Sequence, residues 1–166
     1  MDNYYLNSDD QYVDDQGYKN FDLPTSFQKQ KFCTDLELLR SGSDIKIPTY
    51  DFKTESGKDY IHIKSNTVIL VEGLFIYHYD VIMSHLDYKV MVQLPLELAY
   101  ARRLKRDMAE RDYTEEVTKY RYFNHVEPAY LKFIDPYVSK MDLLVDNTTD
   151  LSEGEALLKE RIEKVL

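Results

Sequence analysis

The chain has 166 residues, of which 43% are hydrophobic and 31% charged, a size and composition typical of one globular domain. Its formal net charge of −9 argues against general nucleic-acid binding, which needs a positive surface to displace counterions. Cys33 is the only cysteine and excludes an internal disulfide, and no apolar run approaches the roughly 20 residues of a membrane span. The acidic, polar first residues are unlike a signal peptide, so we expect a cytoplasmic protein.

The first half of the chain predicts a loop, a helix and a hairpin. Residues 6–24 are polar and indicate a long loop, whereas residues 25–40 carry apolar side chains at helical spacing. Two short alternating runs follow, at 45–52 and 59–63, and a polar turn that contains Gly57 joins them. This pattern predicts a small antiparallel hairpin.

The second half alternates apolar runs with helical patterns. Residues 67–71, TVILV, form a continuous apolar run, which is typical of a strand buried on both faces of a parallel sheet. Similar runs occur at 89–94 and 141–145. Helices are expected between and after these runs, at about 79–86, 95–111, 114–134 and 150–166. The pattern predicts an α/β fold with a mostly parallel sheet plus the hairpin, in a single domain over residues 1–166.

Two groups of side chains point to phosphate chemistry. Glu72 follows the 67–71 run, and ligands gather at the carboxyl ends of such strands. Two interpretations are open: Glu72 caps the next element, or it belongs to a magnesium site, since Mg²⁺ takes one or two carboxylates. Arg102, Arg103 and Arg106 share one arc of the expected 95–111 helix. A solvated basic face is the alternative, but arginine in an acidic chain favours phosphate binding.

Eight short strings, in their order and spacing, resemble the uridine kinase family, a branch of the P-loop kinases that includes phosphoribulokinase and pantothenate kinase. The strings are DNYY (2–5), NFDLP (20–24), IPTYDF (47–52), ILVEG (69–73), RRLKRDMAER (102–111), VEPAY (126–130), FIDPY (133–137) and MDLLVDN (141–147). The combination is specific, although no single string is. The resemblance implies a P-loop-kinase-like three-layer fold. It also implies ATP-dependent phosphorylation, with Mg²⁺, of the 5′-hydroxyl of a pyrimidine nucleoside such as uridine or cytidine.

The same resemblance implies roles for individual residues. Asp2 would be the catalytic carboxylate that deprotonates the nucleoside 5′-hydroxyl, and it would share the magnesium site with Glu72. Arg103 would contact the acceptor, while Arg106 and Arg111 would belong to a lid over the ATP phosphates. The nucleoside pocket would be lined by Tyr5, Asp22, Tyr50, Phe52, Glu55 and Arg121. Within that pocket, Asp22 would bind the ribose hydroxyls.

Three departures from the family pattern stand out. The sequence contains no G-x-x-x-x-G-K-[ST] loop, so we expect the family's N-terminal βα unit to lie outside this sequence and the chain to be inactive by itself. Glu55 and Gly57 stand where the family usually has a histidine and an arginine. The lid string E-R-G-R ends here in Asp112 and Tyr113, so one lid arginine is replaced.

Two other functions remain open on the sequence alone. The acceptor of the same chemistry could be another hydroxyl-bearing metabolite, or the chain could be a non-catalytic remnant or binding module. The absent P-loop favours the remnant, whereas Asp2, Glu72 and the arginines favour a kinase. The expected ligands are a nucleoside and ATP, with neither nucleic acid nor membrane as a partner, and the family suggests a homo-oligomer.

Overall fold

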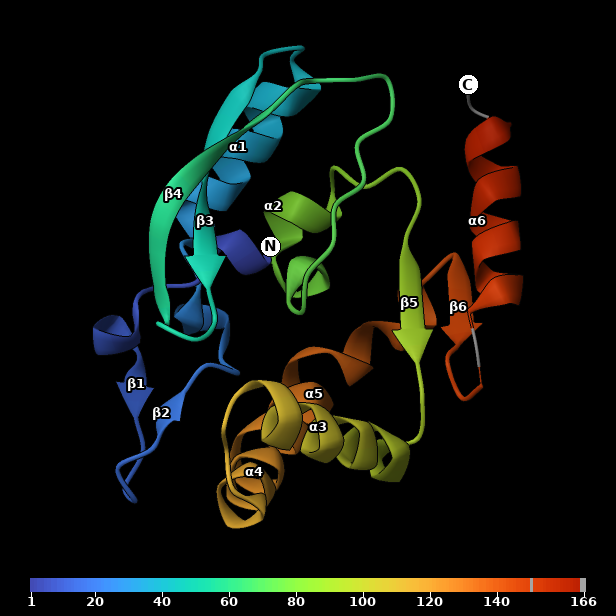
Figure 1. The fold of residues 1–166 in the computed structure, drawn as a ribbon. Coiled ribbons are helices and arrows are strands. Elements are labelled where there is room, and N and C mark those ends of the chain that lie inside the picture. The colour runs from blue at the N-terminus through green and yellow to red at the C-terminus, as the bar shows by residue number, and fades with distance from the viewer. Residues whose placement is uncertain (150, 165–166) are drawn as a thin grey trace.

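The computed structural model describes residues 1–149 and 151–164, which form a mixed α/β fold (Figure 1). In chain order the strands and α-helices are β1 Tyr12–Val13, β2 Lys19–Asn20, α1 Lys29–Arg40, β3 Ile45–Asp51, β4 Ser56–Ile63, α2 Asp80–Met83, β5 Val90–Gln93, α3 Leu96–Glu110, α4 Glu115–Arg121, α5 Glu127–Phe133, β6 Leu143–Asp146 and α6 Ser152–Glu163. The α1 helix and the β3–β4 hairpin form one side of the molecule, and β5, β6 and α6 form the other. Helices α3, α4 and α5 connect the two sides.

The strands form three separate two-stranded sheets within the described residues. Pairs β1–β2 and β3–β4 are antiparallel, and only β5–β6 is parallel, with Val90 opposite Leu143. The α/β class is therefore confirmed, but the predicted mostly parallel sheet is wrong for this structure. The predicted hairpin is confirmed, with a register shift between Pro48 and Tyr50.

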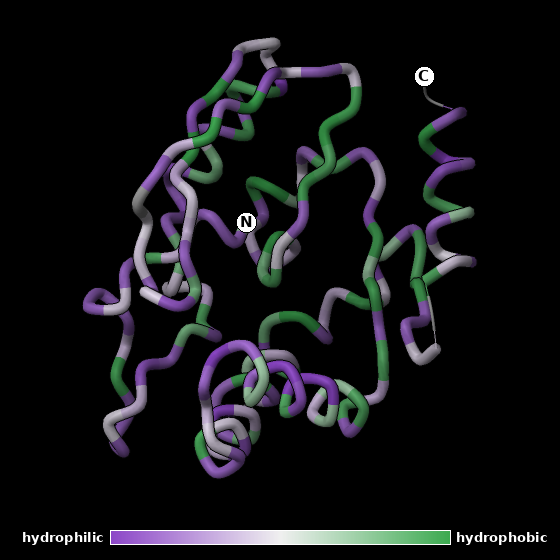
Figure 2. Tube along the Cα trace, viewed as in Figure 1, coloured by the Kyte–Doolittle hydropathy of each residue, from purple (hydrophilic) through white to green (hydrophobic). Residues whose placement is uncertain are grey.

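The apolar segment 67–71 accounts for the difference. It was expected to be a buried parallel strand, yet it belongs to none of the sheets of the described chain. Ile69 and Val71 pack against the core, whereas the Leu70 side chain is 85% exposed. Figure 2 shows hydrophobic residues along this segment and along β5. A strand needs a neighbour for its backbone N–H and C=O groups, so an apolar run without a partner remains irregular.

The expected helix over 114–134 is divided into three parts. Helix α4 ends at Arg121, a π-helical turn spans Tyr122–Val126, and α5 begins at Glu127. The N–H of Glu127 bonds to the carbonyl of Tyr122, five residues back. Pro128 follows, and its ring and missing N–H disfavour ordinary α-helical bonding to residue 124. The wider turn places His125 in the interior.

The hydrophobic core lies between α1, β3 and the segment around α2. Phe75 and Ile82 are completely buried, and Phe27 and Phe32 pack in the same cluster. Ile45 and Ile47 alternate with exposed residues along β3, which turns the apolar face of the hairpin toward the core. No helix of the described segments is both long and apolar enough to cross a membrane. Packing against this core holds the hairpin next to the first residues of the chain.

Candidate functional site

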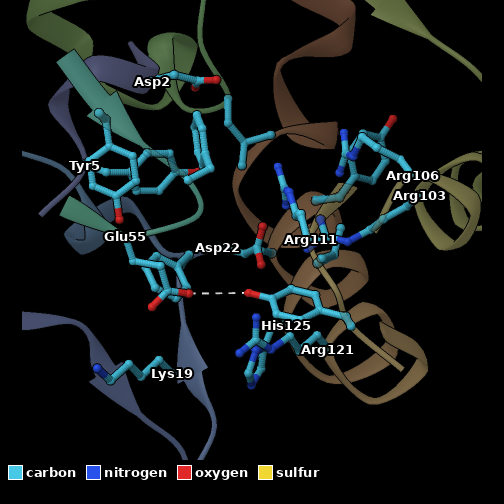
Figure 3. A pocket seen from close by; sticks show the side chains of 18 of the residues that line it. Asp2, Tyr5, Lys19, Asp22, Glu55, Arg103, Arg106, Arg111, Arg121 and His125 are labelled. Atoms are coloured by element: carbon cyan, nitrogen blue, oxygen red, sulfur yellow. Dashed lines mark hydrogen bonds between the residues drawn. The ribbon is translucent and has the colours of Figure 1, made fainter. Parts of the chain in front are cut away.

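A cavity of about 330 Å³ opens between the first residues, the end of the β3–β4 hairpin and helices α3, α4 and α5 (Figure 3). All of the residues predicted for the site line this cavity, with the exception of Glu72. They are Asp2, Tyr5, Asp22, Tyr50, Phe52, Glu55, Arg103, Arg106, Arg111 and Arg121. The structure thus brings together positions that are up to 119 residues apart in the sequence, from Asp2 to Arg121.

One wall of the cavity is aromatic. The ring of Tyr5 lies 5.4 Å from that of Tyr50 and 5.9 Å from that of Phe52, and Phe21 approaches it from another side at 6.2 Å. Tyr50 lies near the end of β3 and Phe52 follows directly after the strand, and both rings line the cavity. Burial raises the pKa of Tyr50 to about 12, with the negative charge of Glu55 adding to the effect. This wall offers flat apolar contacts suited to a planar ring.

Some polar groups in the cavity lack a hydrogen-bond partner among the residues that the structure describes. The hydroxyl of Tyr50 and Nε of Arg121 are buried without a hydrogen bond to the described part of the chain. Buried polar groups are nearly always hydrogen-bonded in proteins, so these two are suited to bind a ligand's polar atoms. Asp22 lies beside them, and burial raises its pKa, opposed by Arg103 first and then by His125 and the other nearby arginines.

The carboxylate of Asp2 faces the cationic side of the cavity. Desolvation raises the pKa of Asp2, as does the negative charge of Glu72, whereas Arg111 and Arg106 lower it. Glu72 lies outside the cavity lining, its side chain 72% exposed, with Oε1 3.1 Å from the Met1 amino group. A Cβ atom at Gly73 would lie 2.2 Å from Cβ of Met1, so only glycine permits this close approach of the two segments. Gly73 thus brings Glu72 close to the first residues, outside the cavity but near the edge where Asp2 lies.

The arginines of α3 have two different orientations. Arg103 and Arg106 point into the cavity with Arg111, which follows the end of the helix. All three surround the buried carboxylate of Asp107. Arg102 instead donates hydrogen bonds of 2.8 and 3.0 Å to the carbonyls of residues 147 and 148. Arg102 therefore connects α3 to the loop after β6, apart from the site.

Glu55 is held inside the cavity. The hydroxyl of Ser8 donates to Oε2 of Glu55, and the hydroxyl of Tyr113 donates to Oε1 at 3.3 Å (Figure 3). The N–H of Ser8 also donates to the backbone carbonyl of Glu55 at 3.0 Å, where Glu55 adopts the left-handed conformation with φ of 49°. These contacts fix the glutamate in the pocket, and it does not extend into solvent as part of a loose turn.

Sequence reasoning missed nine of the residues that line the cavity, among them Lys19, Phe21, Tyr113 and His125. The ammonium of Lys19 donates to the hydroxyl of Ser8 at 2.8 Å, which supports the Ser8–Glu55 contact. Tyr113 could have been found, because it stands at the replaced lid arginine. His125 reaches the site only through the π-helical turn, which no sequence pattern indicates.

A partly buried network joins the β1–β2 turn to α4 and the π-helical turn. Nε2 of His125 lies 2.7 Å from Oδ2 of Asp14, and the hydroxyl of Tyr120 donates to the same oxygen at 3.0 Å. Desolvation opposes ionisation of Asp14, but hydrogen bonds from the N–H of Tyr18, from His125 and from Tyr120 lower its pKa to about 2. The network closes the end of the cavity where His125 lies.

Comparisons with known proteins agree with this arrangement. Residues 3–152 match the model of the phosphoribulokinase/uridine kinase family. A uridine kinase of Shewanella sp. (strain W3-18-1) is 31% identical over 166 residues, covering 99% of this chain and 78% of that protein. A uridine kinase of Psychromonas ingrahamii is 29% identical over 168 residues, covering 96% of this chain and 79% of that protein.

Proposed function

The chain belongs to the phosphoribulokinase/uridine kinase family, and from this membership we propose that it acts in the ATP-dependent phosphorylation of the 5′-hydroxyl of a pyrimidine nucleoside. The observation that carries the proposal is one cavity that combines an aromatic wall, the carboxylate of Asp2 and the side chains of Arg103, Arg106 and Arg111. Its role would be nucleotide salvage in the cytoplasm. Residues 1–166 would form a single domain related to the three-layer fold of the P-loop kinases.

The nucleoside is proposed to bind between the aromatic wall and Asp22. The base would lie against Tyr5, Tyr50 and Phe52, whose rings surround the apolar part of the cavity. Asp22 would accept hydrogen bonds from the ribose hydroxyls. The unpaired groups of Tyr50 and Arg121 would gain partners from the ligand, which removes the cost of leaving them buried and unsatisfied.

The phosphoryl side of the site is proposed to work by positioning and charge. Asp2 would accept the proton of the 5′-hydroxyl, and its raised pKa makes it a stronger base than an ordinary aspartate. Arg106 and Arg111 would stabilise the negative charge on the phosphoryl group, and Arg103 would contact the acceptor. Asp2 and Glu72 would supply carboxylate oxygens to hold Mg²⁺, which would neutralise charge on the ATP phosphates.

Glu55 gives the proposed site a base preference. An ionised glutamate only accepts hydrogen bonds, so it would face the amine of cytosine favourably and the carbonyl of uracil unfavourably. Its two oxygens already accept from Ser8 and Tyr113, which keeps the carboxylate in place toward the cavity. An unpaired buried acceptor costs about 1–3 kcal/mol, roughly a factor of ten to a hundred in affinity. We therefore expect cytidine to bind more tightly than uridine.

Isothermal titration calorimetry on the 166-residue chain tests both the proposed nucleoside binding and the proposed preference for cytidine. Cytidine and uridine should bind, whereas ribose alone should bind much more weakly because it lacks the aromatic contact. Glu55→Gln should reduce the preference for cytidine, because glutamine both donates and accepts. Asp59→Asn is the matched control, since Asp59 is an exposed acid on β4 away from the cavity. Absence of binding by either nucleoside contradicts the proposed function, and equal binding contradicts the role of Glu55 alone.

A further inference from the structure

Asp107 is a buried acid that touches the cationic side of the site without lining the cavity. Its side chain is 1% exposed and lies on α3. The arginine cluster that surrounds it consists of Arg103, Arg106 and Arg111. The nearest nitrogen–oxygen distances to the three are 3.0, 3.2 and 3.5 Å, in that order. One carboxylate therefore contacts all three arginines that are proposed to bind the phosphates or the acceptor.

The backbone of Asp107 fixes the chain that follows α3. Its carbonyl accepts the N–H of Arg111 at 3.1 Å and the N–H of Tyr113 at 3.3 Å. Asp112 between them adopts the left-handed conformation, with φ of 57°, which turns the chain back toward the helix. Asp107 thus holds both the side chain of Arg111 and the turn that carries it.

Charge and position make opposite contributions at this residue. As a negative charge, Asp107 offsets part of the positive charge of the arginine cluster and so weakens its attraction for an anion. As a fixed anion, it accepts hydrogen bonds from Arg106 and forms ion pairs with Arg103 and Arg111, which orders three long side chains that would otherwise lose rotamer freedom when an anion binds. A buried acid that three site arginines share is unnecessary for a purely solvated basic face. The two contributions can be separated because they change anion affinity in opposite directions.

We propose that Asp107 is a positioning residue that holds the arginine cluster in the geometry needed to bind the phosphate chain of the phosphoryl donor. This rests on the proposed function, because that function supplies the phosphates. Asp107 itself touches neither donor nor acceptor and acts through the arginines. Its spacing of four residues from Arg103 and from Arg111 places all three on one side of the end of α3.

The test is calorimetric binding of inorganic triphosphate to the 166-residue chain and to Asp107→Asn. The variant removes a negative charge, yet we expect binding to weaken by about ten- to hundredfold, because asparagine keeps only one, uncharged acceptor oxygen and its NH2 group cannot pair with an arginine. Glu110→Gln removes the same charge from an exposed position three residues further along α3, and its binding should be unchanged or slightly tighter. Binding by Asp107→Asn that equals or exceeds that of the unmodified chain overturns the proposal, as does absence of binding by the unmodified chain.

A second measurement needs no variant at Asp107 and so holds even if that variant fails to fold. NMR relaxation of the arginine Nε–H groups in the free chain should show order close to that of the backbone for Arg103 and Arg106. Arg102 is the internal reference for an arginine outside the site. Disordered side chains in the arginine cluster overturn positioning by Asp107. Cytidine binding to the unmodified chain tests the proposed function separately. Absence of cytidine binding contradicts the nucleoside proposal and does not change the interpretation of the triphosphate measurement.

Discussion

At the scale of single residues, Asp2 carries the chemistry of the proposal. It lies between Glu72 and the arginine cluster, and the charges of both affect its protonation. Desolvation and the charge of Glu72 raise its pKa, while Arg111 and Arg106 limit the rise. A carboxylate with a raised pKa has a higher proton affinity than a free aspartate, which suits a general base.

Substitution of Asp2 by asparagine should abolish most of the turnover. A positioned general base contributes about 10²–10⁴-fold, so Asp2→Asn should lower kcat by that order. The assay uses the chain fused behind a P-loop segment of the family, with cytidine and ATP, because the sequence itself contains no such loop. Cytidine affinity and thermal stability should change little. Turnover equal to that of the unmodified fusion would assign the base to another residue.

The same residue predicts the acid side of the pH profile. Asp2 must be deprotonated to accept a proton, and its pKa is raised above the ordinary 3.8. The acid limb of kcat/KM should therefore have its midpoint above the value of a free aspartate. The limb should disappear in Asp2→Asn, which carries no titrating group at that position.

At the scale of elements, the Asp14 network joins the β1–β2 turn to the helices beyond the cavity. His125 and Tyr120 both reach one oxygen of Asp14, across more than 100 residues of sequence. Because the π-helical turn carries His125, the shape of this turn and the position of the β1–β2 turn depend on each other.

Asp14→Asn should destabilise the chain in a pH-dependent way. The folded-state pKa of Asp14 is about 2, below the ordinary 3.8, so its ionised form stabilises the fold. That stabilisation is fully present above the unfolded value and is lost as pH falls through the folded one. Urea unfolding should show a larger difference between unmodified chain and variant at neutral pH than near pH 3. Asp15→Asn, an exposed neighbour, serves as the control. A difference that does not vary with pH would contradict the assignment.

Local patterns predicted some elements well and others poorly. The hairpin and α3 were predicted because alternation and helical spacing are properties of the segment itself. The strand at 67–71 was not, because a strand requires a partner and apolar composition does not supply one. The division of residues 114–134 into three parts was not predicted either, because Pro128 indicates a disturbed helix but does not specify a π-helical turn.

At the scale of the whole molecule, the site exists only when distant segments come together. The lining runs from Asp2 to Ile134, and its aromatic, acidic and basic parts come from different elements. Motif order predicted most of these positions because each motif occupies one place in the family's fold. Lys19 and His125 could not be predicted in this way, because they enter the cavity through contacts with Ser8 and Asp14 that only the folded chain creates.

A crystal structure of the chain with bound cytidine tests the central claim most directly. The account predicts the base against Tyr5 and Phe52 with its amine toward Glu55, and the 5′-hydroxyl directed toward Asp2 and Arg103. Cytidine bound outside this cavity, or inside it with the 5′-hydroxyl directed away from Asp2, would contradict the account.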